Sequence, residues 1–174
     1  QQKDQMLEYA VAWAYKNNII IKKLYDGNIL FLRGESLRKT DIDKLIISTS
    51  DKLAEGYAQQ RIKFDDLEQL GKVNGYHWAN HHFEGGYRRE DHTLVGFNTI
   101  VLDVDGTLPL ATAMEVMKDY KAFFYTTKRH QDEDGLDRYR IILPTNYELE
   151  LDREEYKMFM DNVMSALPFE MDES

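Results

Sequence analysis

The sequence contains no cysteine, has fewer basic than acidic residues, and lacks any long apolar run. Without cysteine, the chain can have no disulfide framework, thiolate zinc site or cysteine nucleophile, and this composition suits a reducing cytoplasm. No apolar run approaches the roughly 20 residues of a membrane span, so we expect no membrane partner. The 174 residues suffice for one ordinary domain that buries roughly 70% of its unfolded surface.

Charge is distributed unevenly along the chain. Lys and Arg number 22 against 31 Asp and Glu, a formal net charge of −9. Residues 147–174 hold nine acidic and two basic side chains, which leaves 20 basic and 22 acidic residues before them. Nucleic-acid-binding domains usually carry a basic face, so this balance argues mildly against a tight DNA binder. It does not exclude a metal-dependent enzyme whose phosphate contacts are local.

The N-terminal half predicts helices and a hairpin from its hydrophobic spacing and turn residues. Thr40 and Asp43 resemble a capping box, which predicts short helices after them. The expected elements are a helix over 4–16, a hairpin over 19–32, short helices over 41–70 and a long loop over 73–96. We therefore divide the chain into a helix and hairpin module, 1–72, and a core, 73–174, packed as one unit.

An apolar strand over 98–102 leads into Asp103-Val104-Asp105-Gly106. Strand alternation places Asp103 and Asp105 on the same face and turns Val104 into the core. Two adjacent carboxylates repel each other unless a cation lies between them, and Mg²⁺ or Mn²⁺ with substrate phosphates is the usual cation. The alternative is a strand end followed by a solvated Asp-Gly turn.

The next segments predict a helix over 111–119 and a strand over 121–125, so the order strand, helix, strand favours neighbouring strands in one sheet. The second strand ends in Thr126-Thr127-Lys128-Arg129-His130, whose hydroxyl and basic side chains suit a phosphate-bearing ligand.

A third strand is expected over 138–143 and should stop at Pro144. Arg138 and Arg140 share one face of that strand by its period of two. They form either a phosphate-binding pair or an exposed basic strand edge.

Two families begin with such an acidic motif. Residues Asp103 to Thr107 match the first motif of haloacid dehalogenase-type phosphatases, and residues 123–127 resemble that family's second motif. This resemblance implies Asp103 as nucleophile and Asp105 as general acid. The chain shows no G-D-x-x-x-D motif, and 102 residues precede the acidic pair, whereas that family's nucleophile lies near the start of its domain.

The chain more closely resembles the archaeo-eukaryotic primase superfamily, in its phage and plasmid primase-polymerase form. The resemblance covers about 85–174. It rests on the D-x-D strand, a T-T-x-x-H segment at 126–130, an R-Y-R strand running into Pro144, Met171-Asp172 as the opening of a third motif, and the upstream Gly85-Gly86-Tyr87-Arg88-Arg89.

This resemblance implies an α+β fold with a mixed central sheet, an RRM-like core and flanking helices. It also implies template-dependent nucleotidyl transfer, as a DNA primase or DNA polymerase, by a two-metal mechanism. Asp103, Asp105 and Asp172 would hold two Mg²⁺ or Mn²⁺ ions, and His130 would contact the triphosphate. Further positive charge would come from Lys128, Arg129, Arg138 and Arg140.

The partners implied are a DNA template and primer, an NTP or dNTP, and a helicase domain in the same longer protein. The compartment implied is the cytoplasm of a phage-infected or plasmid-bearing cell. The chain begins without Met and stops just after Asp172, so we expect it to be a piece of a longer protein.

The C-terminal segment predicts a crossover helix over 154–167 that returns Asp172 to the acidic strand. Its apolar positions should pack on the sheet: Tyr156, Phe159, Met160 and Val163. Glu154 and Glu155 are fallback third carboxylates, although a solvated helix face suits them better. His77 and His81 have zinc-like spacing without a clear third ligand. A non-catalytic nucleic-acid-binding domain is the remaining alternative.

Overall fold

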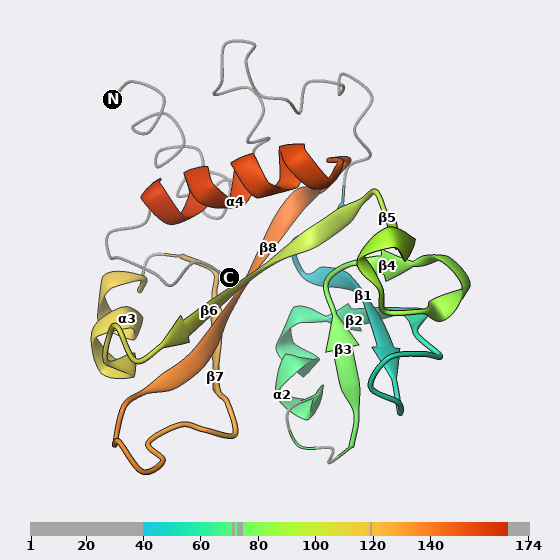
Figure 1. Ribbon diagram of the computed structural model, residues 1–174. Helices are drawn as coiled ribbons and strands as arrows, with labels where there is room; N and C mark the ends of the chain where they lie inside the picture. Colours follow the sequence, from blue (N-terminus) through green and yellow to red (C-terminus); the bar gives the residue numbers. More distant parts are fainter. Residues whose placement is uncertain (1–39, 71, 73–74, 119, 167–174) are drawn as a thin grey trace.

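The computed structural model describes residues 40–166 except 71, 73–74 and 119, and it combines helices with antiparallel sheets in an α+β arrangement (Figure 1). The helix expected over 4–16, the hairpin over 19–32 and Asp172 lie outside the described residues. The helices and strands are β1 (Lys44–Ser50), β2 (Ala58–Lys63), α2 (Leu67–Leu70), β3 (His77–Ala79), β4 (His82–Phe83), β5 (Thr93–Leu94), β6 (Phe97–Asp105), α3 (Leu110–Val116), β7 (Phe123–Thr126), β8 (Arg138–Leu149) and α4 (Arg153–Ala166).

The sheet that contains the two longest strands has the strand order β6-β8-β7, and both of its pairings are antiparallel. β6 and β7 therefore share a sheet, but our expectation that they are neighbours was wrong, because β8 lies between them. A mixed sheet was also expected, whereas every strand pair among the described residues is antiparallel. The return of β8 as the central strand places its arginines inside the sheet, so they do not form a strand edge.

One face of this sheet is the main hydrophobic core. Alternate residues of β6 and β8 point into it, and the helices α3 and α4 cover it (Figure 1). In α4, Phe159 and Val163 are buried while Tyr156 and Met160 pack at the margin, as the amphipathic pattern predicts. The buried sheet residues are Phe97, Ile100, Leu102, Val104, Tyr139, Ile141, Leu143 and Leu149.

The opposite face of the sheet is divided into an apolar and a charged half. Ile142 of β8, with Val101 and Phe123 beside it, packs against Leu45 and Ile47 of β1 in a second core. Towards the Asp105 end, the same face carries only polar positions of β6 and β8. The sheet formed by β2, β1 and β3 thus covers half of this face and leaves the charged half open.

Short helices were expected over 41–70, but only 64–70 is helical, because β1 and β2 form an antiparallel pair before it. The run Leu45 to Thr49 is rich in β-branched residues, which favour strands. Thr40 does not cap a helix, since its hydroxyl donates to the carbonyl of Thr145 at 3.0 Å. The strand propensity of β1 and its burial between two partners outweigh the resemblance to a capping box.

Asn98 connects the two three-stranded sheets. Its Oδ1 accepts the N–H of Ile46 at 3.0 Å, and its Nδ2 donates to the carbonyl of Lys44 at 3.3 Å. Asn98 also lies where the β6–β8 register is irregular. Pro144 was expected to end its strand, but β8 continues to Leu149. Pro144 lacks an N–H, and it is tolerated here because the regular ladder breaks at this point.

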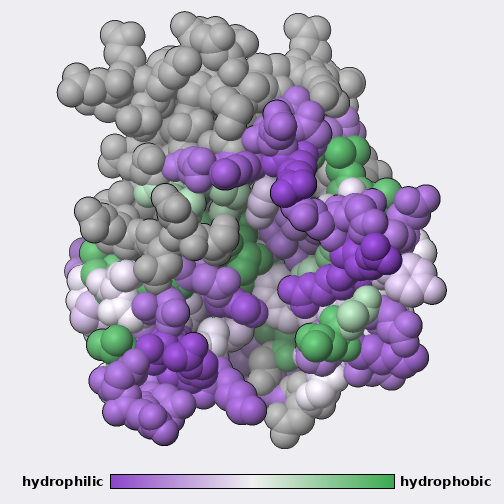
Figure 2. All heavy atoms as spheres, in the orientation of Figure 1, coloured by the Kyte–Doolittle hydropathy of each residue, from purple (hydrophilic) through white to green (hydrophobic). Residues whose placement is uncertain are grey.

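Residues 75–96 contain only short elements, as expected, namely β3, β4, β5 and two turns of 3-10 helix. β3 pairs with β1, so the β2-β1-β3 sheet contains residues from both sides of the boundary expected after residue 72. In the part of the chain that the structure describes, no helix is long and apolar enough to cross a membrane. The described surface in Figure 2 is mainly hydrophilic, with apolar side chains in small separate patches.

Candidate active site

The open half of the β6-β8-β7 sheet brings together the acidic and basic residues singled out in the sequence. Asp103 lies opposite Arg140, and Asp105 lies opposite Arg138, in the β6–β8 register. Asp103 and Asp105 therefore share one face, and Val104 between them is buried, as strand alternation predicts. Each carboxylate accepts a hydrogen bond from the Nε of the arginine opposite it.

Arg138 is a structural centre whose guanidinium is almost fully occupied. Its Nε donates to Asp105, Nη1 donates to the carbonyl of Arg129 (3.2 Å) and to Asp134 (2.8 Å), and Nη2 donates to the other oxygen of Asp134. Four of the five guanidinium N–H groups thus have partners. The side chain is only 10% exposed. We conclude that Arg138 organises the site and has little capacity to bind a ligand.

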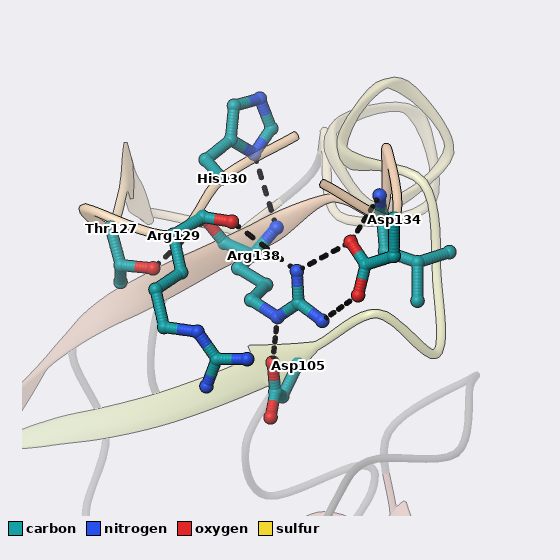
Figure 3. A network of polar contacts seen from close by, with 7 residues as sticks. Asp105, Thr127, Arg129, His130, Asp134 and Arg138 are labelled. Atoms are coloured by element: carbon teal, nitrogen blue, oxygen red, sulfur yellow. Dashed lines mark hydrogen bonds and ion pairs between the residues drawn. The ribbon is translucent and has the colours of Figure 1, made fainter. Parts of the chain in front are cut away.

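Asp134 holds Arg138 from the loop between β7 and β8, on the other side of the guanidinium from Asp105 (Figure 3). The Arg138 hydrogen bonds, together with the N–H of Leu136, hold the pKa of Asp134 well below its usual range. The neighbouring Asp137 accepts the N–H of Leu110 at 2.7 Å, at the start of α3, and this bond lowers its pKa. The loop is therefore fixed to both the start of β8 and the start of α3.

Arg140 differs from Arg138 in both exposure and pairing. Its Nε donates to Asp103 at 2.5 Å and its Nη1 donates to the hydroxyl of Tyr125 at 3.1 Å, so two of its five N–H groups have partners among the described residues. The side chain is 41% exposed. Arg140 is consequently the better placed of the two arginines to meet a phosphate group.

Arg88 belongs to this site, although it was not among the site residues that the sequence indicated. It lines a polar pocket of about 180 Å³ together with Asp103, Arg140, Asn80 and Tyr156. Two arginines, Arg88 and Arg140, thus line the same pocket as one of the two strand-end carboxylates. Arg88 follows the Gly85-Gly86 pair named in the resemblance to primases, and that signal was available in the sequence.

The segment after β7 forms a turn against the start of β8. His130 uses Nδ1 to accept the N–H of Arg138 at 3.1 Å, and Thr127 donates its hydroxyl to the carbonyl of Arg138 at 3.3 Å. Figure 3 shows the His130 ring on the other side of the Arg138 backbone from Asp105. Lys128 and Arg129 are exposed. Of these, the backbone of Arg129 contacts the Arg138 network.

A divalent cation would find two carboxylates here, Asp103 and Asp105. Among the described residues, no group of three or more His, Asp or Glu side chains is arranged to hold a metal ion. Two carboxylates are nevertheless a sufficient protein donor set for Mg²⁺, which keeps several waters and takes phosphate oxygens from a substrate. The donor set therefore fits such an ion, with the arginines opposite as competitors for the carboxylate oxygens.

Glu155 has a structural role that explains its position at the start of α4. Its carboxylate accepts the N–H of Asp152 at 3.1 Å, while its own N–H donates to Asp152 at 2.9 Å. This reciprocal pair is a capping box, which the D-x-x-E spacing could have revealed. Glu154 is exposed on the same helix.

Of the two hydroxyls in the segment that resembles the second dehalogenase motif, one lies away from Asp103 and the other is already hydrogen-bonded. Thr126 pairs with Tyr139 in the β7–β8 register, so its side chain belongs to the opposite face of the sheet from Asp103. Thr127 donates to a backbone carbonyl. His81, considered as a zinc ligand, packs edge-on against Phe97 and Tyr156 with ring centroids 5.2 and 4.7 Å away.

An aromatic pocket of about 470 Å³ adjoins the polar pocket, and Trp78 lines both. Phe123 and Tyr125 of β7 contribute to it, and the rings of Trp78 and Tyr125 lie 6.5 Å apart. A volume of this size is ordinary for a small-molecule site. Trp78 therefore lies between an aromatic pocket and a charged pocket.

Comparison of the chain with protein-family models, with curated proteins and with solved structures finds no match.

Proposed function

We propose that the chain carries the nucleotidyl-transfer site of a primase-polymerase, which extends or starts DNA strands on a template. The observation that carries this proposal is the register Asp103–Arg140 and Asp105–Arg138 on one open sheet face. It places two carboxylates, a donor set that suits a divalent ion, beside Arg140, whose partly paired guanidinium suits a phosphate. The helix-covered antiparallel sheet also supports the RRM-like core that the resemblance to the archaeo-eukaryotic primase superfamily implies.

Asp103 and Asp105 would hold the divalent ion or ions, with Asp172 as the third carboxylate by resemblance. Bound Mg²⁺ or Mn²⁺ would neutralise charge on the triphosphate and favour deprotonation of the attacking primer hydroxyl. Each arginine bonds to the Oδ1 of its carboxylate, so an ion beside Asp103 would compete with Arg140, whereas Arg138 would stay in its network with Asp134. We propose that phosphate groups of the nucleotide then become the partners of Arg140.

The remaining residues of the site would bind and orient the nucleotide. Arg140 provides a partly paired guanidinium beside Asp103, and Tyr125 holds it from the neighbouring strand. His130 accepts the Arg138 N–H through Nδ1, so its Nε2 carries the proton of the neutral ring and can donate to the triphosphate. Lys128 and Arg129 would add positive charge at the exposed turn.

The test is addition of a labelled dNTP to a primed template in Mg²⁺ or Mn²⁺. Asp103→Asn and Asp105→Asn should each lower transfer by at least about a hundredfold, the scale of losing one group that stabilises transition-state charge. Asp91→Asn is the matched control, because Asp91 is an exposed carboxylate on Arg89 and His92, outside the site.

Transfer that survives either site substitution would refute this assignment. Hydrolysis of p-nitrophenyl phosphate that depends on Asp103, without transfer, would favour the phosphatase instead. Nucleic-acid binding without either activity would favour a non-catalytic domain.

A further inference from the structure

Arg88, which lines the polar pocket beside Asp103, lies in a loop that backbone hydrogen bonds join to the loop after β1. The N–H of Tyr57 donates to the carbonyl of Gly86 at 3.0 Å, and the N–H of Arg88 donates to the carbonyl of Ala54 at 2.9 Å. Gly86 has φ +77°, and a Cβ there would lie 2.9 Å from the carbonyl oxygen of Tyr57. Only glycine permits this close approach, which fixes where Arg88 leaves the turn.

Tyr57 holds the Arg88 side chain. The Arg88 Nη1 donates to the Tyr57 hydroxyl at 3.1 Å, and the guanidinium carbon lies 5.8 Å from the centre of the Tyr57 ring. Tyr57 itself is only 6% exposed, and its hydroxyl donates to the carbonyl of Leu53 at 3.0 Å. The bond from Arg88 Nη1 to the Tyr57 hydroxyl is the sole side-chain hydrogen bond of Arg88 within the described residues. Its other N–H groups are available to a ligand.

The charge and size of the pocket restrict what it can hold. Arg88 and Arg140 contribute two positive charges against the single negative charge of Asp103. Burial raises the pKa of Tyr156, so this residue of the lining adds no negative charge. A volume of about 180 Å³ is below the roughly 300 Å³ of the smallest usual ligand sites, so the pocket itself can enclose only a small group such as one phosphate.

We propose that this pocket is a subsite for a single phosphate group, bound by Arg88 and Arg140, and that Tyr57 is the positioning residue for Arg88. The phosphate belongs to a nucleic-acid strand or to a nucleotide, and only this identification of the ligand rests on the proposed function. The subsite lies towards β3, in contrast to the His130 turn between β7 and β8.

The test measures binding of a fluorescent single-stranded oligonucleotide by anisotropy, in EDTA and over a range of salt concentrations. Arg88→Gln should weaken binding roughly ten- to a hundredfold, the scale of losing a charged hydrogen-bond donor. The slope of log affinity against log salt should fall by about 0.7, as expected when the protein neutralises one phosphate fewer. Arg89→Gln, the same charge change one residue later, should change affinity by less than about twofold, because Arg89 is exposed and paired with Asp91.

Tyr57→Phe keeps the ring but removes the hydroxyl, so it should weaken binding less than Arg88→Gln while lowering the salt slope in the same direction. Oligonucleotides with and without a 5′-phosphate, and dATP as competitor, distinguish the sources of the phosphate. Dependence on Arg88 for any of them supports the subsite.

Equal effects of Arg88→Gln and Arg89→Gln, or no effect of Arg88→Gln on any ligand, would overturn the subsite. A failure of nucleotidyl transfer with Arg88-dependent binding intact would overturn the proposed function alone. Transfer with Arg88-independent binding would overturn the subsite alone.

Discussion

The two faces of the β6-β8-β7 sheet are built from alternate residues of the same strands, yet they are stabilised differently. Tyr139 and Ile141 of β8 are fully buried under α3 and α4, whereas Arg140 between them is 41% exposed beside Asp103. Burial of apolar area stabilises the covered face, while exposed ion pairs contribute only about 0–1 kcal/mol. The open face can therefore exchange its partners for a ligand without loss of the fold.

Arg138 is the exception within the open face. Its side chain is 10% exposed and bridges β6 to the loop that carries Asp134. Arg138 and Arg140 each lie opposite an aspartate on the same sheet face, yet Arg138 has a structural role while Arg140 can bind a ligand.

The largest effect on stability is expected at Ile141, which is fully buried. Ile141→Ala should lower the free energy of unfolding by about 2–5 kcal/mol, because it removes buried methyl groups and leaves a cavity. Denaturant unfolding measures this change. Nucleotide affinity of the folded variant should be unchanged, and a loss of affinity without a loss of stability would contradict the division of roles between the faces.

The packing of the His81 ring against Phe97 of β6 and Tyr156 of α4 should make the stability of the chain sensitive to acid. Burial lowers the pKa of His81 to about 4, below the value near 6.5 of the unfolded chain. The unfolded state therefore binds the proton first, so the contribution of His81 is complete above pH 6.5 and is lost as the pH falls towards 4. The loss amounts to at most about 3 kcal/mol.

Unfolding curves at several pH values test this assignment. His81→Phe keeps an aromatic ring against Phe97 and Tyr156, so it should lose less stability between pH 6.5 and 4 than the parent chain does. Burial also lowers the pKa of His82, which should leave a smaller slope in that variant. An unchanged pH profile would show that His81 is not responsible.

A substitution at Arg140 should produce the opposite pattern to Ile141→Ala. Arg140→Gln removes a partly paired cation next to Asp103, so we expect nucleotide affinity to fall roughly ten- to a hundredfold. Stability should change by less than about 1 kcal/mol, as for other exposed ion pairs. Calorimetric titration with dATP and a melting curve make the comparison. Arg138→Gln is the counterpart, and it should lower the melting temperature more than Arg140→Gln.

The sequence predicted the strand-end geometry of the site because local rules determine it. Alternation along β6 places Asp103 and Asp105 on one face, and the same period places Arg138 and Arg140 together. The pairing of β6 with β8 was not predictable, since strand order depends on long-range contacts that no short motif encodes. The contact of Tyr57 with Arg88 was not predictable for the same reason, because the two residues are 31 positions apart in the chain.

Local patterns also misled where two signals competed. Thr40 and Asp43 resemble a helix start, but the β-branched run of β1 and its burial against β6 outweighed that signal. The capping box at Asp152 and Glu155 was real, and there an amphipathic helix follows. The contrast shows that a cap predicts a helix only when the residues after it carry helical periodicity.

The smallest effect separates two functions of His130. Nδ1 accepts the N–H of Arg138, which is a structural bond, while the proposed contact with the triphosphate uses Nε2. The Oδ1 of Asn can replace Nδ1, since it lies at a similar distance from the backbone, but Asn offers nothing at the position of Nε2. His130→Asn should therefore keep the stability of the chain within about 0.5 kcal/mol and lower nucleotide affinity about tenfold.

His130→Ala loses both atoms, so it should also lower stability by about 1 kcal/mol because the Arg138 N–H loses its acceptor. A melting curve and a dATP titration on both variants decide the matter: full affinity in His130→Asn would restrict His130 to holding the turn, and the triphosphate contact would then have to come from Lys128 or Arg129.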